Sequence, residues 1–278
     1  MSRQEDHGKA QTREGGVDYD HSRNRHRTED SRLALGIVFP EGLPASILDV
    51  GCGMGTWLRN IAAAGVTDYI GVDGADIPRE ALLFDPARFI RQDLGTRWNL
   101  GRRFDAALCL EVAEHLAAEN AGALIDALTR HSDLVVFSAA CPGQPGQHHV
   151  HCRWPEYWQG LFNERGYACD DAVRWRLWAM EGVDPWYKQN MFIARRAPGE
   201  AGREPRLRAV VHPEMMPYIR ADITSVTIGR EAAGIAQGSM PAGWYMKVVP
   251  LAFAAKSRRA LARALGMGKS DGSGTSGR

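Results

Sequence analysis

A glycine-rich turn is the clearest sign of chemistry in this sequence. A predicted strand at 46–50, apolar except for Ser46 and Asp49, leads into Gly51, Gly53 and Gly55, and a helical pattern follows. Glycine has no Cβ atom, so it allows positive φ angles and lets a ligand lie against the backbone, while the start of the helix offers unpaired N–H groups. The turn therefore predicts a ligand-binding loop, although by itself it would serve a dinucleotide enzyme nearly as well.

Two carboxylates narrow the choice of ligand. Asp49 lies just before the glycines, where a dinucleotide site usually keeps apolar residues so that a pyrophosphate can approach. An acid at this position suits a cationic ligand instead. Asp73 ends the next predicted strand, 22 residues after Gly51, where a carboxylate can accept hydrogen bonds from both ribose hydroxyls. Together the two acids predict a nucleoside without phosphates.

Three histidines follow the fifth predicted strand: His148, His149 and His151. Ligands of open α/β sheets bind beyond the carboxyl ends of the strands, so this segment is expected to face the substrate. Imidazole, with a pKa of about 6.5, is the usual proton acceptor near neutral pH. His149 is our candidate general base, with His148 and His151 orienting the substrate or one of them acting as the base. The competing interpretation is that all three only bind backbone groups or water.

A metal site is the alternative use of these histidines. In an extended loop His148 and His149 point in opposite directions, whereas His149 and His151 could share a face. The other candidate ligands are distant in the sequence: Glu111, Glu114 and His115. Because two imidazoles do not complete a site, no metal is expected.

Aromatic residues are concentrated after the histidines. Nine of the 23 aromatic residues lie within residues 154–187, a density that often lines a pocket. Trp158 and Phe162 fall on one stripe of a predicted helix, which favours ordinary core packing. Tryptophan faces stack on sugar rings and aryl groups, so a glycosyl or aromatic acceptor is chemically reasonable. The candidate acceptor contacts are Trp154, Trp186 and Tyr187.

The elements that must position these residues form a repeating pattern. Between residues 46 and 140 short apolar runs alternate with helical patterns, which is typical of parallel strands joined by crossover helices. We expect strands at 46–50, 69–73, 88–92, 105–110 and 134–139, then a helix from Pro155 to near Gly166 and a closing strand at 190–196. The sequence predicts an α/β fold, a doubly wound, mostly parallel Rossmann-like sheet.

Four segments resemble the successive motifs of class I S-adenosylmethionine-dependent methyltransferases: residues 47–58, 71–74, 92–94 and 110–116. The resemblance spans roughly residues 31–196 and implies S-adenosyl-L-methionine as the cofactor. Residues 138–158 also resemble a subgroup often associated with small-molecule or surface-sugar modification.

The resemblance also implies cofactor contacts. The first loop would hold the methionine part, the second acid the ribose, the third motif the adenine, and the fourth motif would lie beside the methionine end. In that order the residues are Asp49, Gly51, Cys52, Gly53 and Gly55; Asp73 and Gly74; Asp93 and Leu94; and Leu110 and Glu111. For Asp93 and Glu111 the alternative is a solvated carboxylate at a strand end.

Composition limits the partners and the compartment. Thirty-four Lys and Arg nearly balance 33 Asp and Glu, which argues against an unspecialised nucleic-acid binder. Leu110–Ala113 also stands where a nucleic-acid methyltransferase would carry an Asp/Asn-Pro-Pro-aromatic motif. Five scattered cysteines without a CxxC pair favour reduced thiols in the cytoplasm. No apolar run approaches the roughly 18 residues that a membrane span needs.

The two ends of the chain differ from its middle. Residues 1–30 hold only four apolar side chains, so we expect a disordered arm before a methyltransferase domain at 31–197. Residues 198–265 form an extension of unknown role, and 266–278 a flexible tail. Residues 251–265 have a helical pattern that would suit either an anionic membrane surface or packing on the domain.

These features predict an enzyme that methylates a hydroxyl of a small molecule, a sugar or a natural-product intermediate. Nitrogen or carbon acceptors, a nucleic-acid methyltransferase and a non-catalytic cofactor-binding module remain alternatives. The oligomeric state is left open.

Overall fold

The computed structural model describes residue 19 and residues 27–218 of the 278 residues. The expectations for most of the arm at 1–30, for the helix at 251–265 and for the tail at 266–278 lie outside the described residues. None of the described helices is long and apolar enough to cross a membrane.

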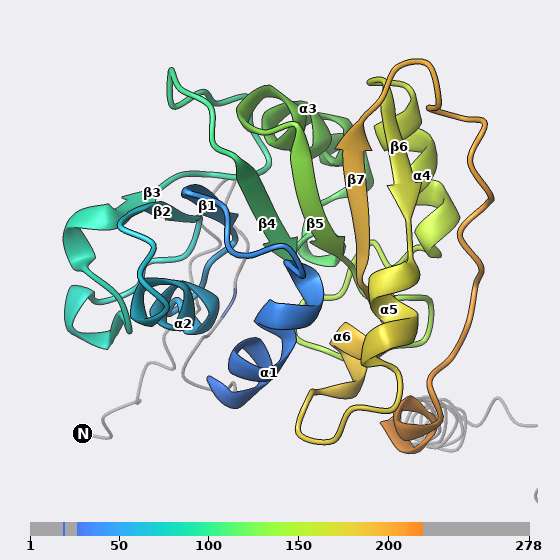
Figure 1. The fold of residues 1–278 in the computed structure, drawn as a ribbon, viewed down its shortest axis with the longest axis horizontal. Coiled ribbons are helices and arrows are strands. Elements are labelled where there is room, and N and C mark those ends of the chain that lie inside the picture. The colour runs from blue at the N-terminus through green and yellow to red at the C-terminus, as the bar shows by residue number, and fades with distance from the viewer. Residues whose placement is uncertain (1–18, 20–26, 219–278) are drawn as a thin grey trace, which may run out of the picture. The chain divides into compact units, whose positions relative to one another are not determined.

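A seven-stranded sheet forms the centre of the described chain (Figure 1), in the order β3-β2-β1-β4-β5-β7-β6. The first five strands are parallel, and β7 is antiparallel to both of its neighbours. This confirms the predicted doubly wound, mostly parallel α/β fold. The strands are β1 (Ser46–Val50), β2 (Asp68–Asp73), β3 (Phe89–Arg91), β4 (Ala106–Leu110), β5 (Leu134–Ser138), β6 (Tyr167–Asp170) and β7 (Phe192–Arg196).

Helices cover both faces of the sheet, which is why the central parallel strands are apolar and buried along their length. On one face α3 and α4 bury leucines and aromatic rings, including Trp158 and Phe162, against Phe137 of β5. That packing confirms the predicted core role of both aromatic residues. On the other face α1, α2 and α5 bury a second cluster. The helices are α1 (Glu29–Val38), α2 (Thr56–Ala63), α3 (Ala121–His131), α4 (Pro155–Asn163), α5 (Ala172–Leu177) and α6 (Pro185–Asn190).

Strand β6 is one of the elements that the sequence analysis missed, as are the short helices α5 and α6. It has only four residues, of which Tyr167 and Cys169 are buried. It is stabilised by a contact that is distant in sequence, because it pairs with β7, which follows only after α5 and α6. In this pairing Tyr167 lies opposite Arg196. A run this short has too few residues to show a strand period. The helix before it, α4, ends at Asn163, earlier than expected.

Residues after 197 continue to pack on the domain. The Glu204 carboxylate accepts hydrogen bonds from Gln159 Nε2 at 2.9 Å, Asn163 Nδ2 at 2.5 Å and the Cys169 backbone N–H at 3.1 Å. Leu207 is buried beside them and donates its backbone N–H to Gln159 Oε1. The extension that begins at residue 198 therefore includes one acid that binds it to α4 and β6.

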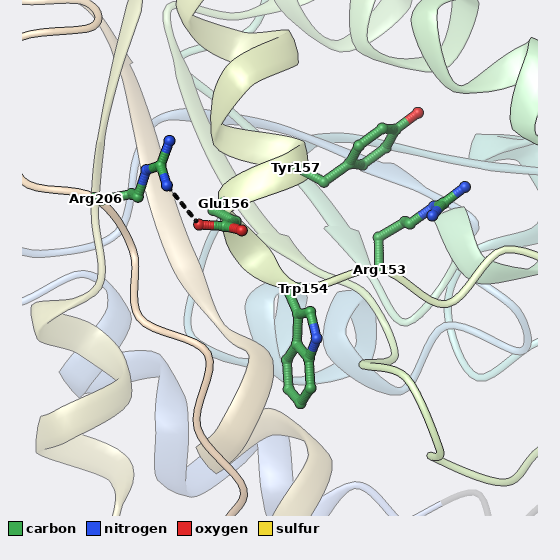
Figure 2. A pocket seen from close by; sticks show the side chains of 5 residues that line it. All are labelled: Arg153, Trp154, Glu156, Tyr157 and Arg206. Atoms are coloured by element: carbon green, nitrogen blue, oxygen red, sulfur yellow. Dashed lines mark ion pairs between the residues drawn. The ribbon is translucent and has the colours of Figure 1, made fainter.

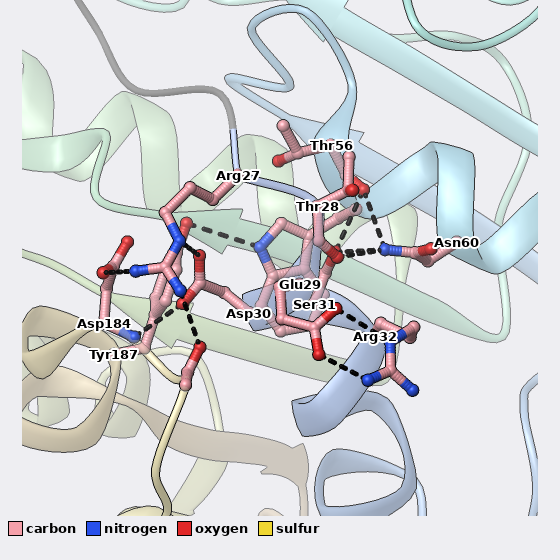
Figure 3. A network of polar contacts seen from close by, with 12 residues as sticks. Arg27, Thr28, Glu29, Asp30, Ser31, Arg32, Thr56, Asn60, Asp184 and Tyr187 are labelled. Carbon is pink, nitrogen blue, oxygen red and sulfur yellow. Dashed lines mark hydrogen bonds and ion pairs between the residues drawn. The ribbon is translucent and has the colours of Figure 1, made fainter. Parts of the chain in front are cut away.

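Helix α1 is tied to the distant loop before α6 (Figure 3). Asp30 is 2% exposed, and its Oδ1 accepts the backbone N–H of Asp184 at 2.6 Å. Arg27 donates to the Asp184 carboxylate at 3.1 Å. Asn60 of α2 donates its side-chain amide to the Thr28 carbonyl and to Ser31 Oγ. The helix thus begins two residues before the expected domain start at residue 31.

Replacement of Asp30 by Ala is expected to lower the free energy of unfolding by about 1–3 kcal/mol, because the partly buried N–H of Asp184 loses this acceptor. Equilibrium denaturation measures the change. Glu29→Ala is the matched control, since Glu29 forms only an exposed ion pair with Arg32 and its loss should change stability far less. Equal effects of the two substitutions would contradict the structural role of Asp30.

Candidate functional site

The glycine turn joins β1 to α2 and depends on the absence of side chains. Gly51 has φ +77° and Gly55 has φ +83°, both in the left-handed region. A Cβ atom would lie 2.3 Å from Val112 Cγ2 at Gly51 and 2.0 Å from Phe84 Cδ1 at Gly55. Any larger residue would therefore be strained and would clash. At the carboxyl edge of the sheet, the main chain of this turn is therefore not covered by side chains of its own glycines.

Asp73 connects the turn to the end of β2. Its Oδ2 accepts the Gly53 N–H at 2.8 Å, and its Oδ1 accepts the Ala75 N–H at 2.8 Å. The neighbouring loops also meet here, because a Cβ atom on Gly74 would lie 4.0 Å from Asp93 Cα. The predicted ribose and adenine residues therefore come from adjacent loops.

The remaining predicted cofactor residues differ in exposure. Asp93 is exposed and accepts the Gly95 N–H at 2.9 Å within its own turn. Leu94, Leu110 and Cys52 are buried, each with no more than 8% of its surface exposed. They can shape the walls of a binding site mainly through apolar contact.

Asp49 is a buried acid next to this turn. It is 4% exposed, and burial, with a further contribution from the nearby Asp73 carboxylate, raises its pKa to about 8. A carboxyl group in this state favours a cation as its partner, since a positive charge stabilises the ionised form.

Glu111 follows β4 in a backbone conformation that is rare for residues other than glycine, with φ +55°. Its carboxylate accepts hydrogen bonds from Gln144 Nε2 at 2.7 Å and from Asn190 Nδ2 at 3.1 Å. Its N–H donates to the carbonyl of Ser138 on β5. Burial raises the pKa of Glu111, whereas these donors lower it. Unusual backbone conformations of this kind concentrate at functional sites.

Gln144 and Asn190 are site residues that the sequence analysis missed. Gln144 lies in the loop after β5, and Asn190 ends α6. The two side chains also bond each other, from Asn190 Nδ2 to Gln144 Oε1 at 2.9 Å. The only sequence signal was that both are amides near the predicted substrate segment, and amides are common without such a role.

His149 is held in a defined orientation. Its Nδ1 lies 2.9 Å from the carbonyl oxygen of Gln144, and its Nε2 lies 4.0 Å from Glu114 Oε1. Since a carbonyl can only accept, Nδ1 carries the proton and Nε2 presents a lone pair. Burial lowers the pKa of His149, so the ring is neutral near pH 7.

The other two loop histidines occupy different surroundings. His148 is exposed and has φ +51°. His151 is buried, and its ring packs at 5.3 Å from the rings of both Tyr157 and Trp158. Its side chain therefore belongs to an aromatic cluster with α4. The ring of His149, by contrast, lies beside the Glu114 carboxylate.

The candidate acceptor aromatics come from two separate segments of the chain. Trp154 lines a surface hollow of about 360 Å³ together with Arg153, Glu156, Tyr157 and Arg206; Figure 2 shows these five side chains. Trp186 and Tyr187 lie on α6 instead. Tyr187 Oη accepts a hydrogen bond from Trp57 Nε1 at 3.4 Å, which places this ring against the helix that follows the glycine turn.

Glu114 and His115, distant from His149 in the sequence, are brought to it by the fold. One potential ligand atom from each of the three residues lies within 4.8 Å of the other two. Burial and the neighbouring Glu111 carboxylate raise the pKa of Glu114, and burial lowers the pKa of His115 to about 4. The sequence analysis found no obvious third metal ligand near His149, whereas in the structure Glu114 and His115 both lie beside it.

Known proteins share this fold. Residues 19–182 match the family described as a methyltransferase domain. Similar solved structures include DesVI of Streptomyces venezuelae (17% identity, 61% of this chain and 93% of that chain covered, TM-score 0.45). Two others are CalS10, an amino pentose methyltransferase from Micromonospora echinaspora (18%, 64% and 94%, 0.45), and the plantazolicin methyltransferase BpumL (16%, 65% and 88%, 0.47). Among curated proteins none matches the sequence significantly.

The family match covers more than half of the chain and includes the glycine turn, Asp49, Asp73 and the motif around Glu111. The strand order, with its antiparallel β7, is that of the same family. The chain belongs to the class I S-adenosylmethionine-dependent methyltransferases.

Proposed function

We propose that this methyltransferase transfers the methyl group of S-adenosylmethionine to a hydroxyl of a small molecule, such as a sugar or a natural-product intermediate. The observation that carries oxygen as the acceptor is the neutral His149, whose Nε2 lone pair faces Glu114 beside the carboxyl edge of the sheet. Methylation of an amine would need positioning more than a base.

The chemistry explains the need for such a base. Methyl transfer is an in-line displacement, in which the acceptor oxygen forms a bond to the methyl carbon while the carbon–sulfur bond breaks and its electrons stay on sulfur. An alcohol is a weak nucleophile until its proton leaves. His149 Nε2 takes that proton, and the Gln144 carbonyl stabilises the resulting imidazolium through Nδ1–H.

The cofactor is held, in this proposal, by the loops at the carboxyl edge. The glycine turn accommodates the methionine part of S-adenosylmethionine, and Asp49, just before the turn, faces its sulfonium and ammonium groups. The loops after β2 and β3 hold the ribose and the adenine. The residues are Asp49, Gly51, Cys52, Gly53, Gly55, Asp73, Gly74, Asp93, Leu94, Leu110 and Glu111. The adjacency of these loops supports the assignment.

The acceptor side is proposed to use exposed groups near His149. His148 and Val150 are exposed in the same loop, Val150 at 55%. Trp186 and Tyr187 are the aromatic candidates near the glycine turn, and Trp154 would contact only a longer acceptor that reaches its hollow. All five cysteines are free thiols, which supports a reducing compartment such as the cytoplasm.

Asp73→Ala is expected to weaken S-adenosylmethionine binding by about tenfold or more, because a charge-assisted contact to the ribose and the anchor of Gly53 are both lost. Isothermal calorimetry measures the affinity. Asp76→Ala is the control, since Asp76 lies in the same loop but forms only an exposed ion pair with Arg91. Unchanged affinity in Asp73→Ala would remove Asp73 from the site.

The affinity for S-adenosylmethionine is expected to rise with pH toward about 8 and then to level off. Below that pH the free protein holds a proton on Asp49, which the cationic ligand must displace, so affinity gains at most about tenfold per pH unit. Calorimetry between about pH 6 and about pH 7.5 tests this slope. Asp49→Asn should flatten it, and the same slope in that variant would show that another group titrates.

His149→Ala is expected to lower turnover by about 10²-fold or more while cofactor affinity is kept, because the proton acceptor is lost. Release of S-adenosylhomocysteine, measured with an alcohol acceptor found by screening, reports turnover. Cofactor calorimetry on the same variant separates lost chemistry from lost folding. A near-normal rate in a variant that binds the cofactor would rule out His149 as the base.

A further inference from the structure

The fold joins Glu114, His115 and His149 into a compact group of metal-ligand types. Glu114 and His115 lie in the turn after β4, and His149 lies in the loop after β5. One carboxylate oxygen and two imidazole nitrogens come within 4.8 Å of one another. Two imidazoles with one carboxylate is a donor set that divalent transition metals favour.

Glu114 lacks the partners that a buried acid needs. Its side chain is fully buried, and neither carboxylate oxygen accepts a hydrogen bond of good geometry from the described residues, although the backbone N–H groups of Glu114 and Ala140 partly offset its burial. The neighbouring Glu111 carboxylate adds repulsion. A buried carboxylate without donors is costly unless a cation or a proton compensates it.

Both imidazoles are oriented as metal-binding histidines usually are. Nδ1 of His149 bonds the Gln144 carbonyl at 2.9 Å, and Nδ1 of His115 lies 3.4 Å from the His148 carbonyl. Metal-bound histidines typically donate their second ring N–H to such an acceptor, which fixes the tautomer and leaves the other nitrogen as the ligand. In His149 the other ring nitrogen is Nε2, whereas His115 is oriented by the backbone of both Gln147 and His148.

The distance between the His149 nitrogen and the Glu114 carboxylate oxygen also fits a bound cation. His149 Nε2 and Glu114 Oε1 lie 4.0 Å apart, too far for a hydrogen bond. An ion about 2.0–2.2 Å from each atom would fill this gap. Tetrahedral ligands lie about 3.5 Å apart, so the wider spacings of up to 4.8 Å close with small side-chain rotations.

The backbone holds this arrangement together. The Glu114 carbonyl accepts the N–H groups of Val150 and His151 at 2.9 and 3.0 Å, which ties the histidine loop to the turn after β4. The His149 ring packs directly on Gly146, where a Cβ atom would lie 2.1 Å from Nε2. The three ligand atoms are therefore positioned by the main chain.

We propose that Glu114, His115 and His149 bind one divalent transition-metal ion and leave a coordination position for the acceptor hydroxyl. A bound ion of this kind lowers the pKa of an oxygen that it coordinates. That catalytic role rests on the proposed O-methylation: with the ion bound, His149 holds the ion instead of taking the proton, and the hydroxyl proton is released to solvent. Metal binding itself requires neither cofactor nor acceptor.

Direct titration of the metal tests the site. The full-length protein is freed of metal with a chelator and titrated with MnCl₂, CoCl₂ or ZnCl₂ by calorimetry, without cofactor or acceptor. One ion should bind per chain for at least one of these metals. Glu114→Gln, His115→Ala and His149→Ala should each weaken its binding by at least about tenfold.

Matched variants and a spectrum exclude other sites. Glu119→Gln changes an exposed carboxylate five residues after Glu114, and His148→Asn changes the histidine next to His149; both should bind metal as the unmodified chain does. Cys152 Sγ lies 3.8 Å from His149 Nδ1, so a thiolate is the competing ligand. The absorption spectrum of the Co²⁺ form should therefore lack a thiolate-to-metal charge-transfer band.

Several results would overturn the metal site: no stoichiometric binding of the three ions, unchanged affinity in the ligand variants, or a thiolate band that Cys152→Ser abolishes. Binding of S-adenosylmethionine, measured by calorimetry, shows which variants are folded. If Glu114→Gln does not bind the cofactor, the metal affinities of His115→Ala and His149→Ala are the test of the site. Metal binding without methylation of any alcohol would refute only the proposed function. Full alcohol methylation by chelator-treated protein would refute only the role of the metal in catalysis.

Discussion

Acidic side chains buried at one edge of the sheet constrain the rest of the site. Asp49 and Glu114 are buried and Glu111 is partly buried, and in the described part of the chain no lysine or arginine forms an ion pair with them. A folded protein tolerates such groups when they are protonated, hydrogen-bonded or matched by a bound cation. The three acids differ in how many hydrogen-bond donors surround them, and this difference suggests which kind of ligand binds beside each.

Glu111 is compensated within the protein, because the amides of Gln144 and Asn190 donate to its carboxylate. Asp49 and Glu114 have no comparable donors among the described residues. Asp49 lies by the bare glycine turn, and S-adenosylmethionine brings a sulfonium and an ammonium group there. Glu114 lies by two imidazoles whose pKa values burial lowers, and these three side chains form the proposed metal site. In the proposed account, the free energy lost by burying Asp49 and Glu114 is recovered when a cation binds beside each of them.

Much of this arrangement could be predicted from the sequence, because it follows from local patterns. The apolar runs of β1, β4 and β5 are buried on both faces, and the glycine turn has the positive φ angles that its composition required. Asp73 follows its strand at the spacing expected of a ribose acid, and its carboxylate does lie on the glycine turn.

The rest depended on contacts between distant segments. Nothing near Glu204 in the sequence indicates that three donors on α4 and β6 surround it, and β6 is too short to show a period. Likewise, Glu114 and His149 are far apart in the chain, and they meet only because β4 and β5 are adjacent parallel strands. From sequence spacing alone no third metal ligand was expected near His149. The adjacency of β4 and β5 nevertheless places Glu114 and His115 beside it.

The most direct test of this account is a calorimetric titration of the intact, folded chain with S-adenosylmethionine. The account predicts saturable binding of one molecule per chain, with a proton released from the buried acid when the measurement is repeated in buffers of different ionisation enthalpy. Folded protein that takes up no S-adenosylmethionine would contradict it.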